Sequence, residues 1–333
     1  MRKNLFYAIA LACCTLGFFT ACDDDDDSSS DWSSLSGTYS DNSLDLMMGE
    51  LTIPVDGKSV TLAATSSSAA TLTLTNVIPE SSDLSMDVTL SATGDGYTLT
   101  GSTSINDCAV TVNGTVSDGN ASIVYDRSLT SDIVGEWTLA SGTNAVYANL
   151  SLGDAQMDAL GAMVGPLVSS LIWTKVSSVD VSLGSDGLFG VSWTKVDETE
   201  ATDISTYLNS FGIQYCVISG NYFIVIDKAY IELTETLLES FASDLLDSYG
   251  ISVDTILAFF QDLGGYYGLP LSYTIDGDSA TFYMGTEAIQ GLLTVASPYL
   301  TGLIPEAYQT MVSSLLALLP YAETLEFGLN MTR

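Results

Sequence analysis

The sequence has 333 residues, of which 41 are Asp or Glu, 8 are Lys or Arg and none is His, so its formal net charge is −33. A chain this acidic repels phosphate backbones, which excludes nucleic acid as an expected partner. Without histidine it cannot assemble a Ser-His-Asp or Cys-His catalytic system or a histidine-ligated metal site. We therefore expect no enzymatic activity, no metal and no cofactor.

Residues 1–21 have the layout of a secretory signal peptide, and Cys22 is the first residue after it. Met1-Arg2-Lys3 is basic, residues 5–19 form an uncharged apolar run, and Thr20-Ala21 precede the cysteine. The alternative to a signal that directs modification of Cys22 is a plain signal peptide followed by an unmodified cysteine. Residues 22–31 follow as a charged, serine-rich tether that cannot bury a core, and the tether begins with Cys22 followed by Asp23, Asp24, Asp25, Asp26 and Asp27.

Residues 32–128 alternate between apolar and polar side chains, which predicts a β domain. The alternation is clear along residues 84–90, where Leu84, Met86, Val88 and Leu90 are separated by polar residues. Because Gly and Asn adopt positive φ at low cost, tight turns are predicted at Asp56-Gly57, 94–96, Asn113-Gly114 and Asp118-Gly119. About seven or eight short strands at this spacing predict a small antiparallel β-barrel or sandwich.

Residues 129–333 are predicted to form a second β-barrel-like domain that carries helical insertions. Gly135-Glu136-Trp137 near its start repeats Gly37-Thr38-Tyr39 near the start of the first domain, which suggests two copies of one architecture. About eight strands are predicted, the number that closes a small ligand-sized barrel. Helical periodicity predicts insertions at 154–171, 232–249, 253–263 and 286–319. Prolines and glycines interrupt the last of these, which argues against a membrane span there.

The candidate ligand-binding residues are Trp137, Phe189 and Trp193, three aromatic side chains on predicted strands of the second domain. Together with the inserted helices they can line an apolar pocket. The alternative is that they fill the core. For Cys108 and Cys216 we favour buried thiols over a disulfide.

Three motifs are explained more simply by composition than by chemistry. The Ser192–Lys195 segment matches Ser-x-x-Lys, but it falls on a predicted strand rather than at the start of a helix. The carboxylates at 197–203 are typical of a solvated loop in so acidic a chain. The oxygen ligands at 41–45 lack the remainder of a calcium loop.

The layout resembles Bacteroidota surface lipoproteins with calycin-like (lipocalin-like) domains, a family of largely unknown function in which some members are labelled putative lipid-binding. The matching residues are Cys22 with its acidic tract, Gly37-Thr38-Tyr39, residues 71–79 and Gly135-Glu136-Trp137. The resemblance implies that Cys22 is acylated, that Asp23–Asp27 act as an export signal, and that the protein is anchored in the outer membrane facing the cell exterior.

We therefore expect a mainly β protein with α insertions that binds an apolar or amphipathic small molecule without catalysis. Its expected partners are the outer membrane, through the lipid on Cys22, and a small apolar ligand. One alternative is a carbohydrate-binding accessory of a nutrient-uptake system, in which exposed aromatics stack on sugar rings. The other is a structural or adhesive surface protein.

Overall fold

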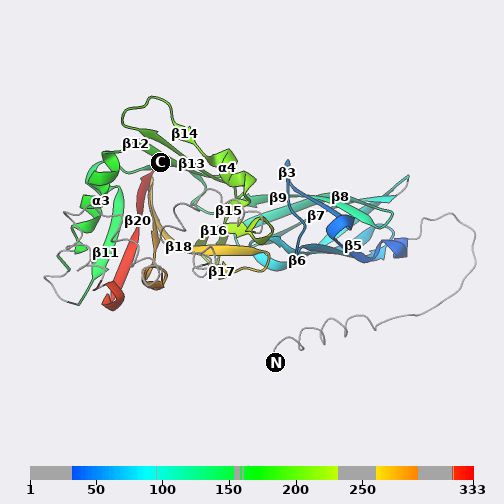
Figure 1. Cartoon of the computed structure of the whole chain (residues 1–333). Coiled ribbons are helices and arrows are strands. Elements are labelled where there is room, and N and C mark those ends of the chain that lie inside the picture. The colour runs from blue at the N-terminus through cyan, green and yellow to red at the C-terminus, as the bar shows by residue number, and fades with distance from the viewer. Residues whose placement is uncertain are drawn as a thin grey trace, which may run out of the picture. The chain divides into compact units, whose positions relative to one another are not determined.

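A computed structural model describes residues 32–94, 96–153, 158–159, 161–231, 260–291, 317 and 319–333. The predicted signal peptide and tether, including Cys22 and Asp23–Asp27, lie outside these residues, as does the predicted helix at 232–249. The chain from Trp32 to Arg333 forms one compact unit, and its described part is mainly β (Figure 1). Its strands form two sheets. The chain passes from the first sheet to the second between Leu129 and Gly135, close to the predicted domain boundary at 128/129.

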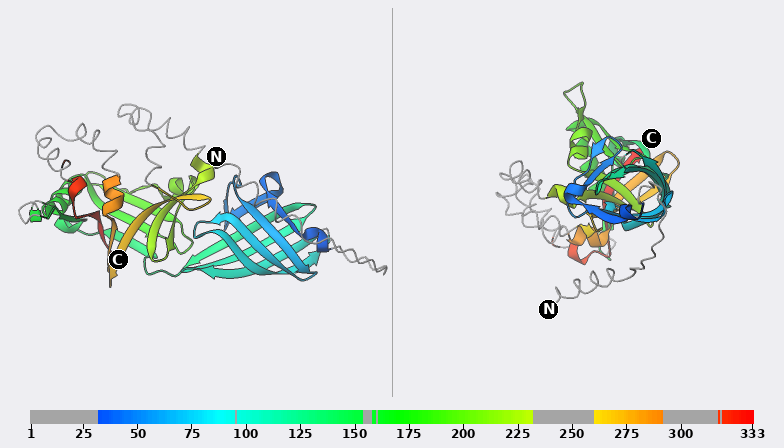
Figure 2. Two further views of the ribbon diagram at one scale, coloured as in Figure 1. Left: turned by 90° about the horizontal axis from the view of Figure 1, so that it is seen from below. Right: turned by 90° about the vertical axis from the view of Figure 1, so that its right-hand side faces the viewer.

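The first sheet contains nine strands in the order β1-β4-β5-β6-β7-β8-β9-β2-β3. Figure 2 shows this sheet, coloured from blue to teal, in two further views. The strands are β1 Gly37–Ser40, β2 Leu44–Met48, β3 Leu51–Thr52, β4 Ser59–Ser66, β5 Ala69–Ile78, β6 Ser81–Thr93, β7 Gly96–Ile105, β8 Cys108–Ser117 and β9 Asn120–Leu129. The predicted strands are all present, but β5 to β9 have at least 10 residues each and are not short.

One strand pair of this sheet is parallel, which corrects the prediction of a purely antiparallel domain. The 3-10 helix η2 (Asp41–Ser43) links β1 to β2 without reversing the chain. An even number of antiparallel pairings leads from β1 to β9, so β9 runs in the same direction as β1. As a result β2 pairs with β9 in parallel.

The turn predicted at Asn113-Gly114 is wrong, because both residues lie inside β8. A Cβ added to Gly114 would approach the Ser122 carbonyl oxygen of β9 to 2.6 Å, so this glycine permits close strand packing rather than a turn. The chain reverses before β8 at Asn106, with a φ of 50°, and after β8 at the predicted turn Asp118-Gly119, with φ values of 48° and 77°.

The second sheet contains eleven strands, and β14-β13-β12-β10-β20-β19-β18-β16-β15 is its main order. Strand β11 pairs with β20, and β17 pairs with β18. The strands are β10 Gly135–Leu139, β11 Val146–Ser151, β12 Val176–Leu183, β13 Phe189–Lys195, β14 Thr202–Asp203, β15 Ile213–Ile218, β16 Asn221–Asp227, β17 Gln261–Asp262, β18 Tyr266–Asp276, β19 Ser279–Met284 and β20 Thr324–Thr332. Eight of these were predicted. The other three were missed: β14 and β17 are only two residues long, and the six residues of β11 lack clear alternation.

Helices occupy a small part of the described chain. The α-helices whose two ends lie in the described ranges are α3 Val164–Trp173 and α4 Ser205–Ser210, and residues 228–231 and 286–291 are also helical. The further 3-10 helices are η1 Trp32–Leu35, η3 Gly142–Asn144 and η4 Leu319–Tyr321. Helix α3 corresponds to the end of the helix predicted at 154–171, and residues 286–291 begin the last predicted insertion. The helix predicted at 253–263 is wrong at its end, where β17 pairs with β18. No helix in the described ranges is long and apolar enough to cross a membrane.

The repeated Gly-x-aromatic motif has the same local geometry in both sheets. Gly37 begins β1 and Gly135 begins β10. The Tyr39 hydroxyl donates a hydrogen bond to the carbonyl oxygen of Leu35, four residues earlier, at 2.9 Å. The Trp137 indole Nε1 donates in the same way to Ile133, at 2.7 Å. The motif therefore fixes the entry of the chain into each sheet by an equivalent contact.

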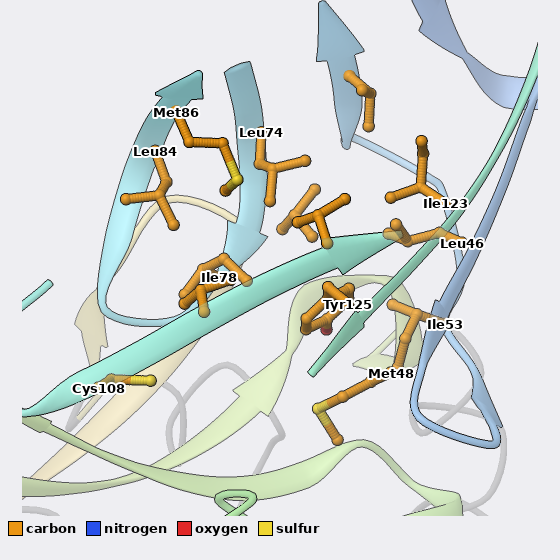
Figure 3. Packing of buried hydrophobic residues seen from close by; sticks show 14 of the residues in the cluster. Leu46, Met48, Ile53, Leu74, Ile78, Leu84, Met86, Cys108, Ile123 and Tyr125 are labelled. Carbon is orange, nitrogen blue, oxygen red and sulfur yellow. The ribbon is translucent and has the colours of Figure 1, made fainter. Parts of the chain in front are cut away.

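Apolar side chains of both sheets belong to one core cluster, which includes the two repeated aromatics. In the first sheet, Leu74, Met86, Ile123 and Tyr125 point into a common interior from β5, β6 and β9 (Figure 3). Cys108 lies in this cluster, and Cys216 lies in a smaller one. Both cysteines are free and buried, as the buried-thiol interpretation predicts.

Candidate functional site

The three predicted ligand-binding aromatics lie on one face of the second sheet. In the strand register, Trp137 is opposite Val181, Phe189 is opposite Leu183, and Trp193 is opposite Val179. Paired residues of antiparallel strands share a face, and residues two apart do as well. The face is common to all three, but their surroundings differ.

Trp137 belongs to the core cluster. Its side chain is 1% exposed. Its ring meets Phe282 edge-on at 5.7 Å between centroids, and the Arg333 guanidinium lies 4.2 Å above it. Phe189 is partly buried and packs against the same cluster. For these two residues the structure favours the core-filling interpretation.

Trp193, in contrast, lines an open apolar groove between β12, β13 and helix α3. The groove has a volume of about 500 Å³. Its walls are almost entirely carbon, and the lining side chains are Val168, Leu171, Ile172, Lys175, Val176, Val179 and Trp193. A site of this size and character suits the hydrocarbon part of a small molecule.

Helix α3 forms one wall of the groove because its small residues, rather than its large ones, face the protein. Gly165 and Ser169 are its buried residues. The Ser169 hydroxyl accepts a hydrogen bond from the Val146 backbone N–H at 2.9 Å and donates one to the Gly165 carbonyl at 2.8 Å. A Cβ on Gly165 would approach the Val146 carbonyl oxygen to 2.9 Å, so β11 and α3 pack closely there.

As a consequence, the apolar stripe of α3 is turned outward. Met163, Leu167 and Leu171 are 65%, 47% and 57% exposed. Such a cluster of large apolar side chains on a surface is typical of a site that contacts a ligand, a lipid or another protein. The helical periodicity at 154–171 puts these three residues on one face, but it carries no information on whether that face is exposed.

Two buried ion pairs lie where the first sheet meets the second: one joins two residues of the first sheet's part of the chain, and the other crosses from one sheet to the other. Arg127 of β9 pairs with Glu80, and both side chains are fully buried. Arg127 also donates to the Gln214 side chain at 2.9 Å and to the Tyr215 carbonyl at 3.0 Å, both on β15. Burial alone would lower the pKa of Arg127, but the Glu80 carboxylate raises it above its ordinary value, so the guanidinium stays charged. Gly187 leaves the space for it, because a Cβ there would collide with the guanidinium.

The second pair joins Lys58, which precedes β4, to Asp227 at the end of β16. Lys58 Nζ lies 2.7 Å from Asp227 Oδ1, and each side chain is 1% exposed. The same oxygen accepts the Ala229 backbone N–H at 3.0 Å. Burial raises the pKa of Asp227, although Lys58 acts in the opposite direction. These contacts hold the sheet that carries the groove in a fixed position.

A second, polar depression lies where β2 pairs with β9. It has a volume of about 210 Å³. Ser122 donates a hydrogen bond to Asp45 at 3.1 Å across it. Hydroxyl, amide and carboxylate groups dominate its lining, which includes Asn42, Ser43, Asp45, Thr115, Ser117, Asn120 and Ser122.

The other sequence motifs do not form reactive sites. Ser192 lies within β13, not at a helix start. Glu198 pairs with Lys195 at 2.8 Å and Asp203 accepts hydrogen bonds from Ser205, so the carboxylates at 197–203 form the solvated loop that composition predicts. In the described ranges no group of three or more Cys, Asp or Glu side chains is placed to hold a metal ion.

Sequence reasoning identified Trp193 and missed the rest of the groove. The available signal was the spacing of Gly161, Gly165 and Ser169, which puts small residues on one helical face. Small residues at that spacing let one face of α3 pack closely against β11, so Leu167 and Leu171 lie on the exposed face of the helix. Comparison with known proteins gives no match, whether with family models, curated proteins or solved structures.

Proposed function

We propose that this protein binds an apolar or amphipathic small molecule, without catalysis, in the groove between helix α3 and strands β12 and β13. The observation that carries the proposal is the carbon-lined groove beside the exposed apolar stripe of α3. Burying apolar surface releases about 25 cal/mol per Å², so an apolar molecule seated there gains affinity from Leu171, Val179 and Trp193 together.

Leu171 and Leu167 provide a matched pair of variants to test this site. Both are exposed leucines of α3, but only Leu171 lines the groove. We expect Leu171→Asp to weaken binding of the neutral fluorescent probe N-phenyl-1-naphthylamine by about tenfold or more, because a carboxylate is placed against the hydrocarbon. Leu167→Asp should bind like the wild type. Equal binding by both variants would place the ligand elsewhere.

We also propose that each sheet closes into a lipocalin-like barrel. In the first sheet, η2 connects β1 at one edge to β2 near the other. In the second, an isolated bridge between Leu188 and Gln214 connects the turn before β13 with β15. These two connections bring the opposite ends of each strand order together and support the proposal.

The proposed location is the outer membrane, facing the cell exterior, through a lipid on Cys22. The sequence before Cys22 and the aspartates after it support this address. Cys22→Ser should shift the protein from the membrane fraction to the soluble fraction and abolish incorporation of an alkyne-labelled fatty acid. Antibody labelling of intact cells should detect the wild type. Unchanged fractionation of Cys22→Ser would contradict lipid anchoring.

Carbohydrate binding is the second candidate, and the polar depression at β2 and β9 favours it. Hydroxyl and amide side chains arranged around a small depression suit the hydroxyl groups of a sugar. The exposed aromatics Tyr207, Tyr321 and Phe327 are carried by α4, η4 and β20 rather than by this depression. Glycan-array binding that is lost in Asp45→Ala and retained in Leu171→Asp would support this alternative.

A further inference from the structure

The positive charges of the described chain are almost all neutralised by contacts within the protein. Lys58, Arg127, Lys195 and Lys228 each form an ion pair with a carboxylate. Arg333 stacks on Trp137 and donates hydrogen bonds to backbone carbonyls. Lys175 differs from all of these: among the described residues, its ammonium has no hydrogen-bond or ion-pair partner.

Among the described residues that line the apolar groove, Lys175 is also the one that carries a charge. It follows α3 directly and is exposed, so its alkyl stem borders the groove while the ammonium reaches solvent. A second lysine lies nearby, because Lys195 is opposite Val176 and two residues beyond Trp193 on the same strand. Glu198 neutralises Lys195 at 2.8 Å, so in the part of the chain that the structure describes Lys175 is the unpaired cation at the groove.

The positive charge of Lys175 is informative because the chain as a whole has a formal net charge of −33. The net field of such a protein repels anions and attracts cations. An unpaired ammonium at the edge of a carbon-lined groove reverses that preference locally. It also provides a partner for an anionic group whose hydrocarbon lies in the groove.

We infer that the ligand is a single-chain amphiphile with an anionic head group, such as a carboxylate. The chain lies against Leu171, Val179 and Trp193, and the head group pairs with Lys175. This inference rests on the proposed function and adds to it the chemical class of the ligand.

Three probes with the same twelve-carbon chain test the inference: dodecanoate, dodecanol and dodecyltrimethylammonium. Binding is measured by calorimetry on the full chain at neutral pH and about 0.15 M salt, where only nearby charges interact strongly. The wild type should bind dodecanoate about fivefold more tightly than dodecanol, the effect of one exposed ion pair, and should bind the cationic probe most weakly.

Lys175→Gln should remove the preference for dodecanoate over dodecanol, while Lys175→Arg should retain it. Lys228→Gln is the control, since it makes the same change in net charge at a lysine that Asp262 already neutralises. A preference for dodecanoate that persists in Lys175→Gln would overturn the inference. Equal binding of the three probes by the wild type would overturn it too, and would leave the apolar site intact. If none of the probes binds, the proposed function fails as well.

Discussion

Replacing Arg127 by Met should lower the free energy of unfolding by about 3–5 kcal/mol, because the change leaves Glu80 as an unpaired buried charge. It also removes the hydrogen bonds to Gln214 and to the Tyr215 carbonyl, which link β9 to β15. Among the described residues, one Glu80 carboxylate oxygen already lacks a hydrogen-bond partner, so no second donor there can compensate for the loss of Arg127. Chemical denaturation followed by circular dichroism measures the loss.

Lys195→Met is the matched control for this prediction, since it breaks an ion pair whose lysine is 57% exposed. Its effect should stay within about 1 kcal/mol. The double variant Arg127→Met with Glu80→Leu should recover part of the stability, because no uncompensated charge then remains in the interior. An Arg127→Met protein as stable as Lys195→Met would contradict a structural role for the pair.

Lys58→Met should produce the second large loss, again about 3–5 kcal/mol at neutral pH, because Asp227 is then buried without a cation. The loss should depend on pH. Burial raises the pKa of Asp227 in the folded protein, and removing Lys58 raises it further. The pKa of Asp227 is about 3.9 in the unfolded chain and higher in the folded protein. At pH values between these two pKa values, the folded state binds the proton of Asp227 more tightly than the unfolded chain does.

The contribution of Asp227 to stability therefore falls as pH rises through that window, and it falls furthest in Lys58→Met. We expect the free energy of unfolding of Lys58→Met to be only slightly below that of the wild type near the lower limit of this pH window, and furthest below it at neutral pH. Lys58→Met with Asp227→Asn should lose most of the pH dependence. A deficit that is constant across the window would show that Lys58 acts through packing and not through its charge.

The sequence predicted the strands well because most of them bury one face. Residues 84–90 alternate strictly, and β6 presents Leu84, Met86, Val88 and Leu90 to the core while the intervening side chains face solvent. Where alternation was weak or the strand short, as in β14 and β17, prediction failed. The parallel pairing of β2 with β9 depends on the path of the chain through η2, and periodicity carries no information about that path.

The site was harder to predict than the fold, because it depends on which face of a helix meets the sheet. Periodicity groups Leu167 with Leu171 but cannot say whether the group is buried. Trp137 and Trp193 looked equivalent in the sequence, each on a strand of the second domain. Only the position of α3 separates a core tryptophan from one that borders a groove. The buried ion pair of Arg127 and Glu80 could not be predicted from the sequence either, because the two residues are far apart in the chain.

The most direct test of the central claim is solvent extraction of the purified full-length protein followed by mass spectrometry of the extract. A lipid attached covalently to Cys22 stays with the protein, so the extract reports only what is bound noncovalently. We predict an apolar or amphipathic molecule in near-stoichiometric amount from the wild type and from Leu167→Asp, and its loss from Leu171→Asp. The same amount of extracted molecule from all three proteins, or none from any, would contradict ligand binding in the groove.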